Sequence, residues 1–378
     1  MSSRAKVVLA REASRFPGSL LGICLLLLAI SVVVLKSASL RPDGTLMHYM
    51  NRQLIWASLG LATFFGASLI PYPKLGRRAW VVYLLGLAAL GAVLFLGTKV
   101  NGSRRWFDLG VVRVQPSELM KYVLVITLAH VVARRGEEIK TWGGLLEAGV
   151  ISLIPFGFVM LQPDLGTSLT FVPIAGAIVF AAGARLLHIG LLIGGALASL
   201  PFAWWFVLQD YQKDRVLSFM SPTGDRALEG AYQTNQSMIA IGNGGLWGRG
   251  YMEGTQGPLG FLPERHTDFV FGVIGEDFGL IGAAALLGLY GYLICVLGQI
   301  AQRTRDPEGR LLVVGVTAIL ATQLAVNVGM AMGLTPVTGL TLPLVSYGGS
   351  SLVAAMFGFG LVASVARHRV RMFVPNGE

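Results

Sequence analysis

Ten apolar segments, each close to the length that crosses a lipid bilayer, constrain the fold of this chain more than any other feature. They lie at residues 20–35, 54–70, 80–96, 119–133, 145–161, 165–182, 186–208, 269–297, 311–334 and 351–365. About 20 apolar residues span the hydrocarbon core as a helix, and a helix satisfies its own backbone polar groups there. The segments therefore predict an all-α integral membrane protein with about ten transmembrane helices, forming a single polytopic domain over residues 1–378.

The composition agrees with a membrane protein and excludes a soluble domain. Hydrophobic residues make up 54% of the chain and charged residues 13%, whereas soluble domains have about 45–50% and about 25%. The formal net charge of +10 does not indicate a nucleic-acid partner, because the basic residues lie in short clusters between the apolar segments. Such clusters are typical of topology signals and of contacts with anionic lipid headgroups.

The basic clusters also predict how the chain is oriented. With both termini in the cytoplasm, the cytoplasmic loops hold more than half of the 30 Lys and Arg residues, as positive charge in such loops requires. The first apolar segment follows a basic stretch but is longer than the apolar region of a signal peptide, so we interpret it as an uncleaved span. Residues 209–266 are then a long extracytoplasmic loop between the seventh and eighth helices.

Basic residues on the predicted outer face are the first candidates for a binding site. The connection 98–115 carries four of them, including Arg104 and Arg105. Topology gives no reason for positive charge there, so we interpret these residues as contacts for an anionic ligand. The alternative is an interfacial turn in which Trp106 and Phe107 anchor at headgroup level while the arginines contact lipid phosphate.

Charged residues near helix ends are the next candidates. Glu118 and Lys121 are three residues apart, so on a helix they share a face and can pair within the membrane. Intramembrane charges mark functional sites by default, although a pair that only locks neighbouring helices is the alternative. Asp164 follows a Gln-Pro pair in a tight turn at 162–167 and is a further candidate site residue. The alternative is a structural role, in which it only holds the turn or caps the next helix.

The stretch 261–277, FLPERHTDFVFGVIGED, is where the long polar loop becomes an apolar helix. Asp268 stands at that boundary, where a carboxylate is costly to desolvate yet reachable from water. Its alternative role is to cap the helix that follows. Glu276 and Asp277, deeper in the helix, are expected to make structural hydrogen bonds or, as a second choice, to line a watery cavity.

Irregular backbone is expected on the same outer face. The segment 241–250 is rich in glycine, and the segment 333–351 carries no charge and several glycine and proline residues. Such backbone persists at membrane depth only where protein or a water-filled cavity satisfies it. Together with the charged residues, it predicts an outward-opening cavity for an anionic, amphiphilic substrate.

Long, ordered motifs between residues 101 and 351 resemble those of the SEDS family of bacterial membrane proteins, named for shape, elongation, division and sporulation. They are NGSRRWFDLG, QPSELMK, QPDLGT, YQ followed by RVLSF, AIGNGGLWGRG, GTQGPLGFLPERHTDFVFGVIGED and GLTPVTGLTLPLVSYGGSS. Within the family, FLPERHTDF and QPDLGTSL are more similar to RodA members of the elongation machinery than to FtsW members of the division machinery. The resemblance implies a SEDS fold and a peptidoglycan glycosyltransferase that joins lipid II units into glycan strands, with polyprenyl pyrophosphate leaving.

The resemblance also implies residue roles. Asp268, the aspartate of the HTDF motif, is the essential residue of the family, and we expect it to take the proton from the attacking sugar hydroxyl as a general base. Arg104, Lys121 and Arg215 are candidate contacts for the pyrophosphate, since positive charge stabilises the leaving oxygens. Motif position favours Arg104 over Arg105.

Further expectations concern the supporting groups and partners. Glu118 is expected to orient Lys121 or to help bind a divalent cation such as Mg²⁺ or Mn²⁺, and His266 to orient Asp268 or share a metal with it. No metal ligand is assigned, because a lone His-x-Asp is a weak metal signal. The implied partners are a class B penicillin-binding protein, other elongation-complex proteins, lipid II, the glycan strand and membrane lipids, without nucleic acid. The implied location is the bacterial cytoplasmic membrane, and a lipid II flippase or a non-catalytic scaffold for a transpeptidase remain alternatives.

Overall fold

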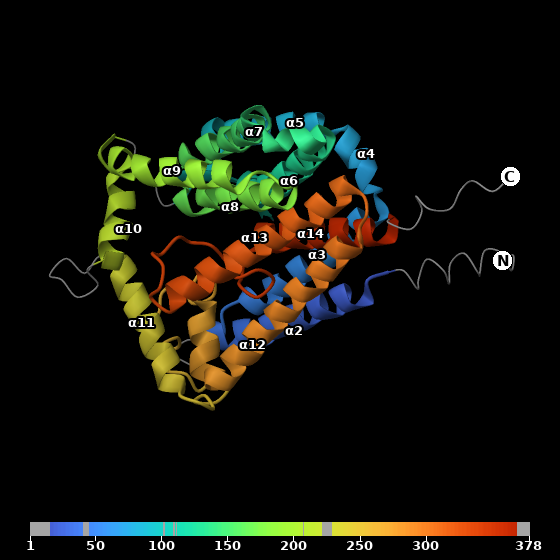
Figure 1. The fold of residues 1–378 in the computed structure, drawn as a ribbon. Coiled ribbons are helices and arrows are strands. Elements are labelled where there is room, and N and C mark those ends of the chain that lie inside the picture. Colours follow the sequence, from blue (N-terminus) through green and yellow to red (C-terminus); the bar gives the residue numbers. More distant parts are fainter. Residues whose placement is uncertain are drawn as a thin grey trace, which may run out of the picture.

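The computed structural model describes residues 16–40, 45–100, 103–108, 110, 112–206, 208–220 and 229–368. Each of the ten predicted segments coincides with a helix in this part of the chain (Figure 1). The helices are α2 (Gly18–Ala38), α3 (Tyr49–Leu69), α5 (Ala79–Leu96), α6 (Pro116–Arg135), α7 (Trp142–Met160), α8 (Leu165–Ala181), α9 (Leu186–Phe206), α12 (Val270–Arg303), α13 (Pro307–Ala331) and α14 (Gly349–His368). The expected all-α membrane fold is therefore confirmed.

Within the described residues, eight of these helices are long and apolar enough to cross a membrane by themselves. The other two are α8, which has 17 residues, and α3, whose first turns carry Arg52 and Gln53. The short helix α4 (Tyr72–Arg77) and the 3-10 helix Gly136–Lys140 connect longer helices. The chain is a multi-pass membrane protein.

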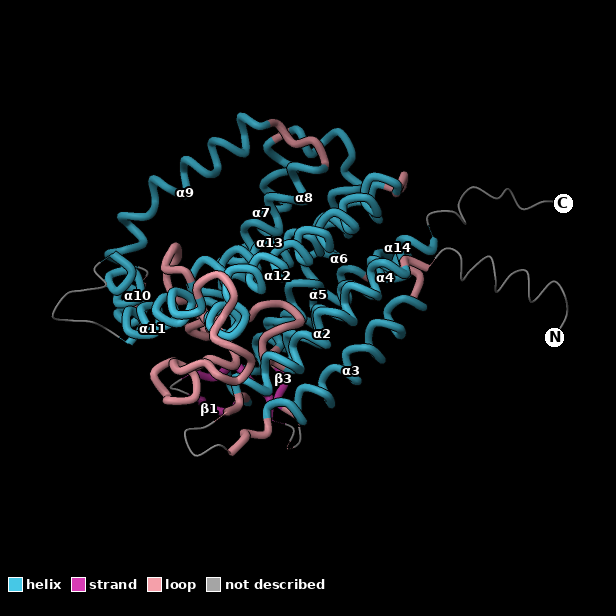
Figure 2. The backbone as a smooth tube through the Cα atoms, turned by 90° about the horizontal axis from the view of Figure 1, so that it is seen from below, coloured by secondary structure: helices cyan, strands magenta, loops and turns pink. Residues whose placement is uncertain are grey.

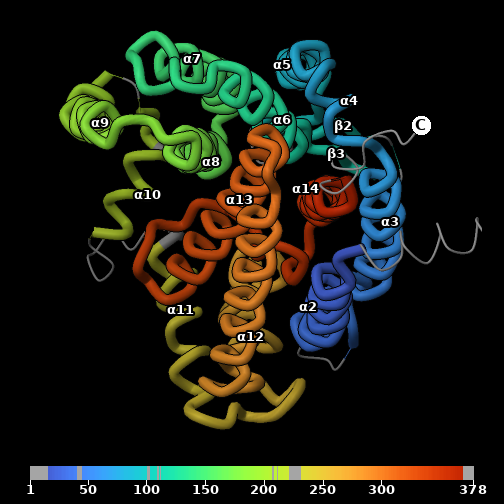
Figure 3. Tube along the Cα trace, turned by 45° about the vertical axis from the view of Figure 1, so that its right-hand side comes forward, coloured from blue at the N-terminus to red at the C-terminus, as the bar shows by residue number. Residues whose placement is uncertain are grey.

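The best-buried helices are α6 and α14, and each has neighbours on several sides (Figure 3). Helix α14 packs closely on α3, because small residues let the two backbones approach. A Cβ on Gly360 would lie 2.5 Å from the carbonyl oxygen of Phe64. By contrast, α9 buries only His188 among its described side chains and stands away from the rest of the bundle (Figure 2).

Two predicted loops contain regular structure. The connection 98–115 forms a small antiparallel sheet in the order β1 (Thr98–Val100), β2 (Ser103–Asp108) and β3 (Arg113–Val114). The segment 209–266 contains α10 (Asp210–Met220) and α11 (Glu229–Gly244), which run in succession along one side of the molecule (Figure 1). Both segments lack the long apolar run by which the spanning helices were recognised, so the sequence did not predict regular structure in them.

Helix α12 is interrupted at Gly279, where φ is 66° and ψ is −164°. The glycine-rich loop fills this break, since Gly245 accepts a hydrogen bond from the amide of Leu280 and Leu246 accepts one from Ile281, at 2.9 and 3.2 Å. A Cβ on Gly279 would lie 2.3 Å from the amide nitrogen of Gly248. The predicted irregular backbone of the glycine-rich segment therefore completes a broken helix.

The connection between α13 and α14 has little regular structure, as expected for the uncharged segment 333–351. It is held by neighbours: the Tyr290 hydroxyl donates to the carbonyl of Pro343 at 2.5 Å, and the amide of Tyr347 donates to the carbonyl of His266 at 2.8 Å. The second bond joins this connection to the loop that carries Asp268.

Candidate active site

Asp268 lies in the loop before α12, and neighbouring elements fix its backbone. The Asn327 amide, on α13, donates to the carbonyl of Asp268 at 2.9 Å and to that of Leu340 at 2.7 Å. The Ser346 hydroxyl donates to the carbonyl of Thr267 at 2.5 Å. The Asp268 loop is therefore fastened both to α13 and to the irregular connection that follows it.

The capping alternative for Asp268 is wrong. Helix α12 begins at Val270, its N-cap is Phe269, and no side chain caps it. The carboxylate instead faces Gly339, since a Cβ built there would lie 3.6 Å from Oδ2 of Asp268. With φ at 77°, Gly339 takes a backbone conformation that other residues rarely adopt. The space beside the carboxylate thus depends on a residue without a side chain.

The pKa of the Asp268 carboxyl is raised to about 6, chiefly by burial and to a smaller extent by the nearby charges of Glu264 and Asp164. A hydrogen bond from Thr267 and the positive charge of Arg215 oppose this shift of the pKa. Two expected site residues, Asp164 and Arg215, therefore lie within electrostatic reach of Asp268. Asp268 is partly exposed as a residue, and the pKa of its carboxyl is raised toward neutral pH, which suits a general base.

Asp164 sits at the start of α8 and performs the capping role foreseen for it. Its Oδ1 accepts from the amide of Thr167 at 3.2 Å, and its Oδ2 accepts from the side-chain amide of Gln115 at 3.2 Å. A guanidinium nitrogen of Arg105 lies 3.8 Å from Oδ1. Arg105 also donates to the carbonyls of Gln162, at 2.9 Å, and Pro163. The small sheet is thus attached to the turn that holds Asp164.

Arg104 and Arg105 occupy different environments because neighbours on a strand point to opposite faces. Arg105 is half-buried against the Asp164 turn, whereas Arg104 is exposed and donates to the carbonyl of Phe95 at 2.8 Å. The structure therefore brings Arg105, and not Arg104, beside Asp164. Motif position alone did not reveal which arginine faces inward.

Glu118 and Lys121 form the predicted ion pair in the first turns of α6. The Lys121 ammonium lies 2.8 and 2.9 Å from the two carboxylate oxygens of Glu118. Lys121 has no exposed surface and Glu118 is 7% exposed. In this state the ammonium is therefore paired inside the bundle and has no contact with solvent.

His266 packs among aromatic rings. Its imidazole stacks on the ring of Tyr49, with ring centroids 4.0 Å apart, and lies 5.8 Å from the ring of Tyr347. Burial lowers the pKa of His266; the charge of Glu264 opposes this effect and that of Arg265 adds to it. At neutral pH the imidazole is therefore uncharged, and its described ring contacts are with aromatic side chains.

Glu276 makes structural hydrogen bonds, as expected, whereas Oδ2 of Asp277 is buried without a hydrogen-bond partner among the described residues. Glu276 accepts from the amide and hydroxyl of Thr255, at 2.8 and 2.9 Å, and from the amide of Gln256.

The sequence analysis missed Asn327, which the structure shows to be fully buried. A polar amide within an apolar segment is a signal that the sequence does contain.

The described residues contain no group of three or more His, Cys, Asp or Glu side chains placed to hold a metal ion. Asp268, Glu264 and Asp164 are the carboxylates whose charges meet at the site. Such a set fits Mg²⁺ only if substrate phosphate and water supply further ligands, as is common for that ion.

Comparisons with known proteins place the chain in context. A family model described as "cell cycle protein", covering FtsW, RodA and SpoVE, matches residues 18–371. The peptidoglycan glycosyltransferase MrdB of Escherichia coli K12 is 40% identical over 354 residues, which is 93% of each chain. The probable peptidoglycan glycosyltransferase FtsW of Marinobacter nauticus is 38% identical over 352 residues, covering 91% of this chain and 87% of that protein.

Solved structures agree with this grouping. The crystal structure of the rod shape determining protein RodA of Thermus thermophilus matches with a TM-score of 0.70 and 33% identity, covering 94% of this chain and 97% of that chain. A chain from a study of how a peptidoglycan synthase complex coordinates polymerization and crosslinking matches with a TM-score of 0.80 and 33% identity, covering 94% and 98%. The chain therefore belongs to the FtsW, RodA and SpoVE family of cell cycle proteins, the SEDS family that its motifs resemble.

Proposed function

We propose that this protein is a peptidoglycan glycosyltransferase that polymerises lipid II into glycan strands for cell elongation and shape. The observation that carries the proposal is Asp268, a partly exposed residue whose carboxyl has a pKa of about 6 and whose backbone is fixed from two sides. Relatives that match over nine tenths of the chain and are named peptidoglycan glycosyltransferases support the same activity.

In the proposed reaction, Asp268 accepts the proton from the 4-hydroxyl of the acceptor sugar. The hydroxyl oxygen attacks the anomeric carbon of the donor as the bond to polyprenyl pyrophosphate breaks. A base whose pKa lies near the working pH typically accelerates such a step about 10²–10⁴-fold. The pyrophosphate leaves as a stable anion, so no second carboxylic acid is needed to protonate it.

Positive charge is proposed to receive the leaving pyrophosphate. Arg215 is the best-supported contact, because its charge already reaches Asp268. Arg104 and Lys121 remain proposed contacts, and Glu118 is proposed to orient Lys121. Arg105 joins this group through its position beside Asp164.

Two supporting roles remain proposals. His266 is proposed to steady the Asp268 loop through its stack on Tyr49. Asp268 or Asp164 would hold a divalent cation such as Mg²⁺ or Mn²⁺, which would supply positive charge for the leaving pyrophosphate, and chelation during the assay tests that role.

The proposed setting is the bacterial cytoplasmic membrane, with one polytopic domain over residues 1–378, both termini in the cytoplasm and the site on the outer face. The segment 209–266 would then lie outside the cell. A class B penicillin-binding protein is the proposed partner, together with other elongation-complex proteins. The match to a chain from a peptidoglycan synthase complex that joins polymerization to crosslinking supports this partner.

The test is polymerisation of fluorescent lipid II by the purified full chain, alone and with its transpeptidase. Asp268→Asn keeps the shape of the side chain but cannot accept the proton, so we expect no glycan product. Asp210→Asn is the matched control, because the Asp210 side chain is fully exposed on α10. Product from wild type and from Asp210→Asn, but none from Asp268→Asn, supports the assignment.

Three results would overturn the proposal. Full activity of Asp268→Asn removes the general base. Translocation of labelled lipid II across liposomes without any glycan product establishes a flippase. A wild-type protein that makes no product even with its transpeptidase, while Asp268→Asn still supports growth, establishes a scaffold.

A further inference from the structure

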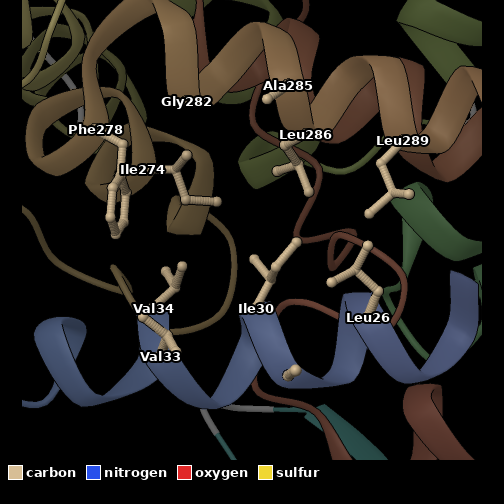
Figure 4. Close-up of a pocket in the computed structure, with 11 residues that line it drawn as sticks. Leu26, Ile30, Val33, Val34, Ile274, Phe278, Gly282, Ala285, Leu286 and Leu289 are labelled. Carbon is tan, nitrogen blue, oxygen red and sulfur yellow. The ribbon is translucent and has the colours of Figure 1, made fainter.

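An apolar groove of about 600 Å³ lies between α2 and α12 (Figure 4). Leu26, Ile30 and Val33 of α2 point across it toward residues of α12 that include Phe278 and Leu289. Leu26 and Val33 are 51% and 44% exposed, so the groove opens on the outside of the bundle. In a membrane protein this surface faces lipid.

The length of the groove decides what can occupy it. Its α2 wall runs from Leu26 to Val34, a rise of about 12 Å at 1.5 Å per residue. The hydrocarbon core is about 30 Å thick, so one leaflet contributes about 15 Å. The α12 wall extends further, from Ile274 to Leu289, but it is broken at Gly279. The stretch with a wall on both sides therefore matches one acyl chain of one leaflet, whereas a membrane-spanning partner helix would need about twice that length.

The end of the groove carries an amphipathic edge. The hydroxyl of Tyr251 donates to the carbonyl of Val33 at 3.0 Å, and its ring stacks on Phe278 with centroids 6.0 Å apart. Tyr251 therefore bridges both walls, and Trp247 nearby in sequence is 80% exposed. Exposed Tyr and Trp of this kind are typical of the membrane–water interface.

Two basic residues, Lys36 and Arg249, lie near the end of the groove that Tyr251 bridges. Lys36 follows Val33 by three residues on α2, which places both on one face of the helix. Within the part of the chain that the structure describes, the Lys36 ammonium makes no ion pair or hydrogen bond, and Arg249, two residues before Tyr251, is exposed. An ammonium at an interface above an apolar groove complements a lipid phosphate.

We propose that this groove binds an anionic phospholipid, with one acyl chain between α2 and α12 and the headgroup phosphate at Lys36. The lipid would be coupled to the Asp268 loop, because Arg265 donates to the carbonyls of Ala38 and Leu40, at 2.7 and 2.6 Å, just beyond Lys36. Binding is independent of the proposed enzymatic function, whereas the effect of the lipid on polymerisation rests on it.

Native mass spectrometry of the purified full chain tests the site with phosphatidylglycerol and phosphatidylcholine as probes. One basic residue at an anionic membrane surface is worth about 1 kcal/mol, which is about fivefold in affinity. We expect wild type to prefer phosphatidylglycerol and Lys36→Gln to bind it about fivefold more weakly. Lys74→Gln, which removes an exposed charge from α4, should retain the preference.

A second pair of variants tests the groove itself. Ala285 lines the groove and Ala284 does not, although both are exposed on α12. Ala285→Trp should fill the groove and weaken both lipids, and Ala284→Trp should leave binding unchanged.

Equal binding of the two lipids by wild type, or unchanged binding in Ala285→Trp, overturns the proposal. So does loss of transpeptidase co-purification in Ala285→Trp with lipid binding intact, since a protein helix would then be the occupant. Polymerisation in vesicles containing phosphatidylglycerol should exceed that in phosphatidylcholine alone. Selective lipid binding by a wild-type protein that never polymerises would refute the proposed enzyme and leave the lipid site standing.

Discussion

Replacing Asn327 by Leu should loosen the Asp268 loop without touching the carboxylate itself. The Asn327 amide is fully buried and donates to two backbone carbonyls, those of Asp268 and Leu340. Interhelical hydrogen bonds in membrane proteins contribute about 0.6–1.7 kcal/mol each. Loss of both should therefore lower the free energy of unfolding by about 1–3 kcal/mol.

The catalytic effect of this substitution should exceed its effect on stability. Displacement of a catalytic group by about 1 Å costs about 10²-fold in rate. We expect Asn327→Leu to lower kcat for lipid II polymerisation by about that factor with little change in KM. A positioning role also predicts that the pH midpoint of activity shifts, because the environment of the Asp268 carboxyl changes with its position. Thermal unfolding in detergent and polymerisation over a pH series measure both effects.

Gln323 provides the matched control. It lies one turn earlier on α13, is 2% exposed, and its side-chain nitrogen makes no hydrogen bond. Gln323→Leu should therefore leave stability and the pH profile close to wild type. If Asn327→Leu and Gln323→Leu lose stability and activity equally, the hydrogen bonds to Asp268 and Leu340 do not position the base.

Three further predictions follow from individual contacts. Because the pKa of Asp268 is about 6, the rate should rise about tenfold per pH unit below pH 6 and level off above it; a flat profile between pH 5 and 7 excludes this base. Glu118→Gln leaves the Lys121 charge buried without its partner and should lower the free energy of unfolding by about 3–5 kcal/mol. Adding Lys121→Met should recover most of that loss. If the double variant is as unstable as Glu118→Gln, the pair does more than neutralise the Lys121 charge. Gly279→Ala should lower the Tm sharply, because the added Cβ would meet Gly248 and because φ is positive at this residue. Gly288→Ala is the control and should keep the Tm, since there is open space around Gly288. Similar Tm values for the two variants would show that the break in α12 tolerates a side chain.

Hydrophobic patterning was sufficient to predict the ten long helices, because a membrane demands one long apolar run for each span. The same rule could not predict the small sheet or α10 and α11, which lie in polar segments where no such demand applies. The break at Gly279 was also hidden, since the apolar run continues through it and the stabilising carbonyls come from residues 245 and 246.

The residues of the candidate site also divide into those that the sequence predicted and those that it could not. Asp268 and the Glu118–Lys121 pair were visible as charges in apolar surroundings. The preference between Arg104 and Arg105 depended on strand direction, and the aromatic environment of His266 depended on Tyr49, which lies more than 200 residues away in the chain. Tertiary contacts of this kind leave no trace in a local pattern.

The isolation of α9 has a consequence for how freely its sequence can vary. His188, stacked on Trp142 with ring centroids 4.3 Å apart, is its one buried side chain in the described chain. Ile189 is partly buried against the core, and every other described position on α9 needs only to be apolar enough for lipid and compatible with a helix. Random mutagenesis should therefore find α9 the most permissive of the long helices to exchange among Leu, Ile, Val, Ala and Phe, with positions 188 and 189 as the exceptions.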